Sequence, residues 1–368
     1  YAGSRAGVKS VLMVTRMTPD GTGVSGDPVM VFDGHDANPT VEGPKFYKRN
    51  GYYYIFAPAG GVTNGWQLVL RSENVFGPYE HRVVMHQGET AVNGPHQGAW
   101  VTTSFGEDWF IHFQDKGAYG RVVHLQPMQW IDGWPVIGTD NDGDGTGEPV
   151  SSFTRPFAGR VSSSHSPQIN EEFNGSARPT DWQWQANPSQ TWGYPSEAYG
   201  FYRLNCIPVT DSLPNLWEVP NMFLRKLPAE KFTATARVKC TLRSDGEETG
   251  MIVMGRDYGY ISLSRTDGRL WLRVGVCNDA DRGTGEQEVW SQEVQTGDLY
   301  LRLTVENGAL CSFSYSTDGE VFTEAGDRFA ARQGMWIGAK TGFFALRKGF
   351  TNDAGYIDID WFRILTTD

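Results

Sequence analysis

The sequence predicts an all-β protein. Short runs rich in β-branched and aromatic residues recur along it, bounded by Gly, Pro, Asn or Asp, as at residues 10–14 and 52–56. Helical periodicity is nowhere sustained over a dozen residues. The 44 glycines and 19 prolines lie largely between these runs, where short strands joined by tight turns need them.

Size and composition narrow the classes of protein. At 368 residues the chain is longer than one ordinary domain and suggests two or slightly more. No apolar run approaches the roughly 20 residues of a membrane span. A net charge of −11 without any Lys/Arg-rich run argues against a nucleic-acid partner. Aromatic residues reach 13%, which suits sugar binding, although all-β proteins are also rich in aromatic residues.

The first part of the chain carries strand signals at residues 10–14, 52–56, 67–70, 109–113 and 121–125. They amount to about two or three four-stranded units of roughly 40–50 residues, a size that suits propeller blades. A closed propeller needs at least about four blades. Either further blades lie upstream of Tyr1, or this part has another all-β form.

A composition shift near residues 139–170 predicts an interdomain linker, because acidic, Gly-rich and Ser-rich sequence buries little. We place the first domain at residues 1–150, the linker at 151–170 and the second domain at 171–368. Beyond the linker, alternating segments at 232–238, 260–263, 270–274 and 301–305 are typical of a two-sheet sandwich.

The cysteines and histidines divide between the two parts. Cys206, Cys240, Cys277 and Cys311 lie in the second and lack metal-site spacing; we interpret them as buried apolar residues, with a disulfide left open. Every histidine lies in the first 165 residues, which points to site chemistry there. The chain starts at Tyr1 without a methionine or a signal segment, so we expect its natural N-terminus to be absent.

The first candidate for chemistry is Glu42, which lies between Val41 and Gly43-Pro44, just before a strand, turn and strand at residues 45–54. A carboxyl group at such a strand mouth is partly withdrawn from water, as a general acid requires. The alternative is an ordinary surface glutamate beside a turn.

Several motifs together resemble glycoside hydrolase family 43. In the first part they are Glu42-Gly43-Pro44, Gly60-Gly61, HQGAW at 96–100, and GRVVHLQP at 120–127 before DGWP at 132–135. In the second part, RQGMWIGAK at 332–340 and DIDWFR at 358–363 resemble the concanavalin A-like domain appended to β-xylosidases and α-L-arabinofuranosidases of that family.

The resemblance implies a five-bladed propeller that hydrolyses a terminal sugar with inversion, using an acid, a base and a third carboxylate that tunes the acid. Glu42 matches the acid. The base and the tuning Asp belong to the blades that precede the segment resembling Tyr1, so we expect the chain to be inactive unless an upstream segment or a second chain completes it. Asp33 and Asp36 fall outside the family motifs, and we interpret them as turn residues.

The resemblance also suggests residues that bind the sugar. Arg121 matches an arginine of the pocket wall, whose planar donor fork suits vicinal hydroxyls, with a surface arginine as the alternative. His96 and His124 match histidines near the propeller axis; either lines the pocket, contacts a central Ca²⁺ through water, or is a satisfied buried histidine. Gln97, which follows His96 in the HQGAW motif, is a further candidate for binding the sugar. Trp66 and Trp100 are candidate sugar-stacking walls, and core packing explains them equally well.

Calcium is the only metal that the sequence suggests, and the chemistry itself requires no cofactor. Asp140, Asp142 and Asp144 mimic half of an EF-hand loop, but Ser151 stands at its twelfth position, so an acidic linker comes first and a Ca²⁺ site second. In the sandwich, Glu172 near the start and Asp358 or Asp360 near the end would share a structural Ca²⁺ if the first and last strands are neighbours. Solvent-facing carboxylates are the simpler alternative.

These observations lead to an exo-acting inverting glycosidase for plant cell-wall polysaccharide or its oligosaccharides. We place α-L-arabinofuranosidase ahead of β-xylosidase, with an arabinose- or xylose-containing glycan as partner. A non-catalytic carbohydrate-binding protein is the competing hypothesis. The substrate class suggests the periplasm or the cell exterior. Phe343 and Phe344 are predicted core residues unless the sandwich caps the pocket.

Overall fold

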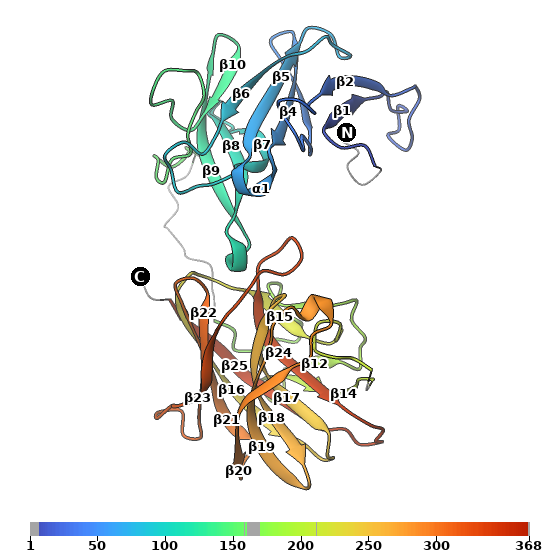
Figure 1. The fold of residues 1–368 in the computed structure, drawn as a ribbon, viewed down its shortest axis with the longest axis vertical. Coiled ribbons are helices and arrows are strands. Elements are labelled where there is room, and N and C mark those ends of the chain that lie inside the picture. The colour runs from blue at the N-terminus through green and yellow to red at the C-terminus, as the bar shows by residue number, and fades with distance from the viewer. Residues whose placement is uncertain (1–6, 158, 160–169, 211, 367–368) are drawn as a thin grey trace. The chain divides into compact units, whose positions relative to one another are not determined.

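The computed structural model describes residues 7–157, 159, 170–210 and 212–366, and nearly all of its regular structure is β-strand (Figure 1). The chain forms two compact units. Unit 1 contains Tyr1–Asp115 and Arg121–Ser164, and unit 2 contains Lys116–Gly120 and His165–Asp368. The all-β prediction is confirmed. The boundary at residues 164/165 falls inside the range predicted as linker, much of which lies outside the described residues.

Unit 1 consists of antiparallel sheets whose neighbouring strands are consecutive in the chain. A pair is formed by β1 (Val11–Val14) and β2 (Val29–Asp33). The first four-stranded sheet contains β3 (Lys45–Arg49), β4 (Tyr52–Ala59), β5 (Trp66–Ser72) and β6 (Glu80–Met85), with the short helix α1 (Gly61–Asn64) between β4 and β5. The second contains β7 (His96–Thr102), β8 (Asp108–Asp115), β9 (Arg121–Ile131) and β10 (Trp134–Ile137). Each four-stranded meander has the form of a propeller blade.

Strand β4 shows why the strand sequences of unit 1 are continuous apolar runs without alternation. Tyr54 and Phe56 belong to one buried cluster, and Ile55 and Ala57 belong to another. Because successive side chains of a strand point to opposite faces, the β3–β6 sheet is covered by apolar side chains on both sides. A sheet buried on both faces does not show the alternation of a half-exposed strand.

The acidic run after residue 139 has the composition of a linker but is part of unit 1. Thr139 and Glu148 exchange two backbone hydrogen bonds of 2.9 Å, and the amide of Gly147 donates to the carbonyl of Val84 in β6. The intervening loop satisfies its own amides with aspartate side chains, so it closes as part of unit 1 without burying apolar surface.

Unit 2 is a sandwich of two large sheets. One sheet has the order β11 (Gln183–Trp184), β15 (Phe223–Lys226), β24 (Lys340–Arg347), β17 (Glu247–Met254), β18 (Tyr258–Thr266), β19 (Arg269–Cys277) and β20 (Gln287–Val294), with β14 (Ile207–Pro208) beside β24. The other has the order β12 (Gly193–Ser196), β13 (Phe201–Asn205), β25 (Tyr356–Thr366), β16 (Phe232–Thr241), β21 (Asp298–Glu306), β22 (Leu310–Ser316) and β23 (Thr323–Ala330). Two 3-10 helices, Gly117–Tyr119 and Ala280–Arg282, also belong to this unit.

The main core of unit 2 is organised around Trp182, which is fully buried. Its ring stacks on Phe223 at a centroid distance of 4.8 Å and meets Phe362 edge-on at 5.3 Å. Phe343 lies in the same core, whereas Phe344 faces a second apolar cluster, as consecutive residues of a strand must. Both are fully buried, which confirms the prediction that they are core residues.

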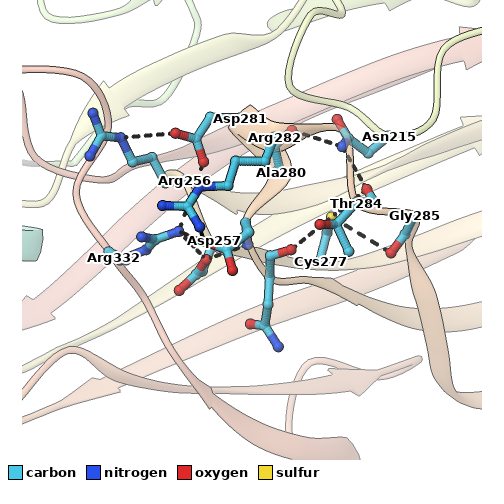
Figure 2. A network of polar contacts seen from close by, with 12 residues as sticks. Asn215, Arg256, Asp257, Cys277, Ala280, Asp281, Arg282, Thr284, Gly285 and Arg332 are labelled. Atoms are coloured by element: carbon cyan, nitrogen blue, oxygen red, sulfur yellow. Dashed lines mark hydrogen bonds and ion pairs between the residues drawn. The ribbon is translucent and has the colours of Figure 1, made fainter.

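Loops at one end of unit 2 are joined by a network of ion pairs (Figure 2). The guanidinium of Arg332, which precedes β24, lies 2.7 Å from a carboxylate oxygen of Asp257 and 2.8 Å from one of Asp279. Arg256 pairs with Asp281. The network therefore connects the β17–β18 loop, the segment after β19 and the β23–β24 loop.

The four cysteines are free and buried, as predicted, so the disulfide that the sequence left open does not form. Burial raises the pKa of Cys240 and of Cys311 to about 12, which makes both thiols unreactive. No helix among the described residues is long and apolar enough to cross a membrane.

Replacing Trp182 with alanine should lower the unfolding free energy of unit 2 by about 3–5 kcal/mol, because the change removes a large buried ring and leaves a cavity. Calorimetry of the unit 2 transition would measure the loss. Phe350→Ala is the matched control, since Phe350 is 88% exposed and should cost little. Equal losses in the two variants would contradict this picture of the core.

Candidate active site

Glu42 lies in the loop before β3, and its main chain is firmly held. Its amide donates to the carbonyl of Pro58 in β4 at 3.1 Å. The preceding Val41 is 1% exposed and packs among apolar residues of β4 and β5. The Glu42 side chain itself is 37% exposed. The fold thus fixes the backbone and leaves the carboxyl group accessible.

Two consecutive residues of β7 bind the same oxygen of Glu42. Nε2 of His96 lies 2.9 Å from Oε1 of Glu42, and Nε2 of Gln97 donates to that oxygen at 3.2 Å. In a regular strand these neighbours would point to opposite faces. The pairing of β7 with β8 is irregular between His96 and Ala99, and Gln97 has a left-handed φ of 52°. This bulge turns both side chains toward Glu42.

Gln97 is itself held from two sides. Its Oε1 accepts a hydrogen bond of 3.2 Å from Nζ of Lys45, which also donates to the carbonyl of Gly43 at 2.8 Å. Gly43 has a φ of 53°, and a Cβ there would lie 2.0 Å from Oε1 of Gln97. The glycine of the Glu-Gly-Pro motif therefore suits the left-handed backbone here, and a larger residue would displace the side chain of Gln97.

Lys45 is a site residue that the sequence reasoning missed. Its side chain is about half-buried, and this burial lowers its pKa while the negative charge of Glu42 opposes the shift. The signal that could have found it is the alternation of half-buried and exposed side chains along β3, in which Lys45 is half-buried. Lys45 also lies only three residues after Glu42. Its ammonium group reaches the motif only because the chain turns sharply at Gly43.

His96 is 1% exposed, and burial lowers its pKa more than the contact with Glu42 raises it. It is therefore neutral at neutral pH, and with Glu42 ionised the contact requires the proton on Nε2. The ring meets Phe113 edge-on at 5.7 Å, and the guanidinium of Arg121 lies 4.6 Å from the same Phe113 ring. The structure therefore brings His96 and Gln97 to Glu42, and Arg121 lies near enough to His96 for its charge to lower the pKa of that ring.

This arrangement can donate a proton and bind hydroxyl groups. The two hydrogen bonds to Oε1 fix the orientation of the carboxyl group of Glu42. The described part of the chain supplies no hydrogen bond to Oε2, so that oxygen can carry a proton toward a ligand. Arg121 is exposed and presents several planar donors.

The two predicted tryptophans lie in packed surroundings. Trp66 donates from Nε1 to Oδ1 of Asn38 at 3.0 Å and packs against the cluster that contains Val41. Trp100 donates from Nε1 to Oδ1 of Asp108 at 2.8 Å, and its ring contacts Tyr47 and Trp130. These contacts are those expected of core packing, so sugar stacking remains a prediction for both.

His124 lies among imidazole and carboxamide groups. Its Nε2 is 3.1 Å from Oε1 of Gln114, and its ring stacks on His112 at 5.3 Å. Ca²⁺ takes carboxylate and carbonyl oxygens, so the oxygen of Gln114 suits the ion and the two imidazole rings do not. A role for His124 at a central ion remains a prediction.

The carboxylates predicted to hold Ca²⁺ in the sandwich are engaged with arginines. Glu172 makes two hydrogen bonds of 2.8 Å with Arg363, and Asp360 is 2.9 Å from Arg237. The start of unit 2 does pair with its last strand, as expected, through Glu171 and Phe362. A calcium ion shared by Glu172 and Asp360 would have to compete with these arginines, and it too remains a prediction.

The other acidic candidates are explained by their turns. Asp140, Asp142 and Asp144 have carboxylate oxygens within 4.8 Å of one another, and these side chains accept hydrogen bonds from amides of their own loop. Asp33 accepts from the amide of His35 at 3.1 Å, which supports its interpretation as a turn residue.

Comparison with known proteins gives the family. The model for glycosyl hydrolases family 43 matches residues 2–135, and the model for the beta xylosidase C-terminal concanavalin A-like domain matches residues 170–365. The chain belongs to glycoside hydrolase family 43. The resemblance seen in the motifs is thereby confirmed.

Relatives of this family member include a putative beta-xylosidase of Xylanibacter ruminicola, 37% identical over 90% of this chain and 59% of that protein. A beta-xylosidase of Formosa agariphila is 29% identical over 95% of this chain and 63% of that protein. A non-reducing end alpha-L-arabinofuranosidase of Bacteroides ovatus is 25% identical over 89% of this chain and 63% of that protein. The chain thus spans about three-fifths of the length of these curated relatives.

Solved structures share the fold. The GH43 protein BlXynB of Bacillus licheniformis matches 98% of this chain and 71% of its own, with a TM-score of 0.82 at 22% identity. A xylan beta-1,4-xylosidase of Bacillus halodurans matches 96% of this chain and 70% of its own, with a TM-score of 0.81 at 19% identity. The predicted combination of propeller sheets and a concanavalin A-like sandwich is therefore confirmed.

Burial lowers the pKa of His112 from 6.5 to about 4. Unfolded protein binds a proton at this residue below about pH 6.5, whereas folded protein binds it only near pH 4, so acid favours unfolding. We expect His112 to lower the unfolding free energy of unit 1 by about 3 kcal/mol between pH 7 and pH 4. Denaturation of wild type and His112→Gln across this pH range should show that the unfolding free energy of the variant depends less steeply on pH. The exposed His81→Gln is the control, and equal slopes for His112→Gln and wild type would contradict the assignment.

Proposed function

We propose that this chain forms part of an inverting, exo-acting glycoside hydrolase that releases terminal α-L-arabinofuranosyl residues from plant cell-wall glycans. The observation that carries the proposal is the accessible carboxyl group of Glu42, oriented by His96 and Gln97 and accompanied by Arg121. Family membership and relatives named as xylosidases and arabinofuranosidases support the reaction class.

In the proposed reaction Glu42 is the general acid. Its Oε2 donates a proton to the glycosidic oxygen as the bond from that oxygen to the anomeric carbon breaks, and the rest of the glycan leaves with that oxygen as a hydroxyl group. His96 and Gln97 act as positioning residues, because their bonds to Oε1 stop the carboxyl group from rotating. Neutral His96 orients the acid without placing a positive charge beside it. Arg121 binds hydroxyls of the terminal sugar.

Inversion also needs a base that activates water on the opposite side of the sugar, with the two carboxyl groups roughly 6.5–9.5 Å apart. We propose that this base and the carboxylate that tunes Glu42 come from a propeller segment outside this chain, in the same precursor or in a second polypeptide. The family resemblance supports this proposal, and so does the turn role of Asp33. Secretion to the periplasm or the exterior, where such polymers are met, belongs to the same proposal.

A β-xylosidase is the second candidate. The relatives from Xylanibacter ruminicola and Formosa agariphila, both more similar than the arabinofuranosidase, carry that name. Arabinofuranose and xylopyranose present similar hydroxyl stereochemistry, so one arrangement of Glu42 and Arg121 serves either sugar.

Replacing Glu42 with glutamine in protein with the complete propeller should lower kcat on an oligosaccharide by about 10²–10⁴-fold. The loss should be much smaller on a nitrophenyl glycoside, because nitrophenolate leaves without a proton. Substrate binding by the variant should persist, which calorimetry would show. The exposed Glu89→Gln is the matched control. Equal losses on both kinds of substrate would exclude Glu42 as the acid.

The sugar specificity is decided by kcat/KM for nitrophenyl α-L-arabinofuranoside and nitrophenyl β-D-xyloside. We expect the arabinofuranoside to be the better substrate of the complete enzyme. A higher value for the xyloside would select the second candidate. Turnover of neither compound, together with retained sugar binding, would favour a non-catalytic carbohydrate-binding protein.

A further inference from the structure

A groove of about 390 Å³ lies on the outer face of the sheet that contains β13, β25 and β16. The alternate residues of these strands, such as Tyr202 and Ile359, belong to the core, so the charged groove residues face away from it. Its lining includes Tyr199, Phe201, Arg237, Lys239, Asp358 and Asp360. All of them belong to unit 2.

The floor of the groove carries charges of alternating sign. Across the sheet, Arg203 is paired with Asp358, Asp358 with Lys239, and Lys239 with Asp298. Nε and Nη2 of Arg203 donate to the two oxygens of Asp358 at 2.6 and 2.7 Å. Two cationic side chains, Arg237 and Lys239, and three carboxylates line the groove. Arg203, beside the lining, neutralises the third carboxylate through its bond with Asp358, so the floor favours a neutral ligand with many hydroxyls over an ion.

Asp358 and Asp360 are held in place by arginines. Asp358 is 8% exposed, and Asp360 accepts from Arg237 at 2.9 Å. A carboxylate oxygen with one arginine partner retains capacity to accept a further hydrogen bond. The floor therefore offers acceptors and donors at fixed positions to the hydroxyls of a ligand.

An aromatic wall stands beside this floor. Tyr199 is 80% exposed, and its ring stacks on Phe201 at a centroid distance of 6.0 Å with an interplanar angle of 12°. The turn before it is fixed, since the amides of Tyr199 and Gly200 both donate to the carbonyl of Ser196. An exposed, oriented aromatic face beside fixed polar groups suits a sugar ring, which is apolar on its faces and polar at its edge.

We propose that this groove is a second, non-catalytic carbohydrate-binding site, which takes a neutral pentose-containing oligosaccharide. The choice of sugar rests on the proposed function, whereas the site itself does not involve Glu42. Tyr199 stacks on a sugar ring, and Arg237, Asp360 and Asp358 bind its hydroxyls, with Arg203 holding Asp358 in place. Such a site would hold the chain on its polymer while the propeller site acts on chain ends.

The test is a calorimetric titration of the full chain with xylohexaose. Tyr199→Ala should weaken binding by up to about tenfold, because stacking contributes roughly 0.5–1.5 kcal/mol. Tyr199→Phe keeps the aromatic face and should bind like wild type. Phe350→Ala removes an equally exposed ring of unit 2 that does not line the groove, and should also bind like wild type.

Two results would overturn the proposal: no binding of xylohexaose by the wild type at millimolar concentration, or equal affinity of wild type and Tyr199→Ala. Unchanged unfolding temperature of the alanine variant shows that a loss is local. The Glu42→Gln chain should retain groove binding. Absence of binding at the groove therefore does not contradict the hydrolase proposal, and absence of hydrolysis does not contradict the groove proposal.

Discussion

The candidate active site depends on one constraint, the bulge in β7 that points two consecutive side chains at a single carboxylate oxygen. Without it, only one of His96 and Gln97 could reach Glu42, and the carboxyl group would be free to rotate. The close approach of Gly43 to Gln97 follows from the same geometry. A proton donor works when its direction is fixed in advance, and here the fold supplies that direction before any ligand arrives.

The two units use charged residues in different ways. In unit 1 the accessible carboxyl group of Glu42 is oriented by neutral donors, so its chemistry stays available. In unit 2 the carboxylates of Glu172, Asp358 and Asp360 are paired with arginines. Such pairs satisfy partly buried charges and build a patterned polar surface. This pairing weakens the case for a shared calcium ion and at the same time creates the floor of the groove beside Tyr199.

Sequence reasoning predicted the fold class and the sandwich core residues Phe343 and Phe344, which are confirmed. It also named Glu42, His96 and Gln97, which the structure brings into contact, while their roles and that of Arg121 stay predictions. It succeeded where the signal is local: alternation, turn residues and an ordered set of motifs. It assigned the acidic loop after residue 139 to the linker, because composition cannot reveal that Thr139 and Glu148 pair across it. It missed Lys45, whose role depends on a contact with Gln97, 52 residues away in the chain.

The sequence by itself determined that the chain is all-β, that its second part is a sandwich, and that Glu42 stands in a family 43 motif, because each follows from short-range pattern. Only the tertiary structure decided which donors bind Glu42, which arginine takes each acidic side chain of the sandwich, and that Trp100 packs among aromatic rings. Hydrogen bonds and ion pairs of this kind join residues far apart in the chain. Strand register and a single bulged residue set their distances, and neither is written in local residue preferences.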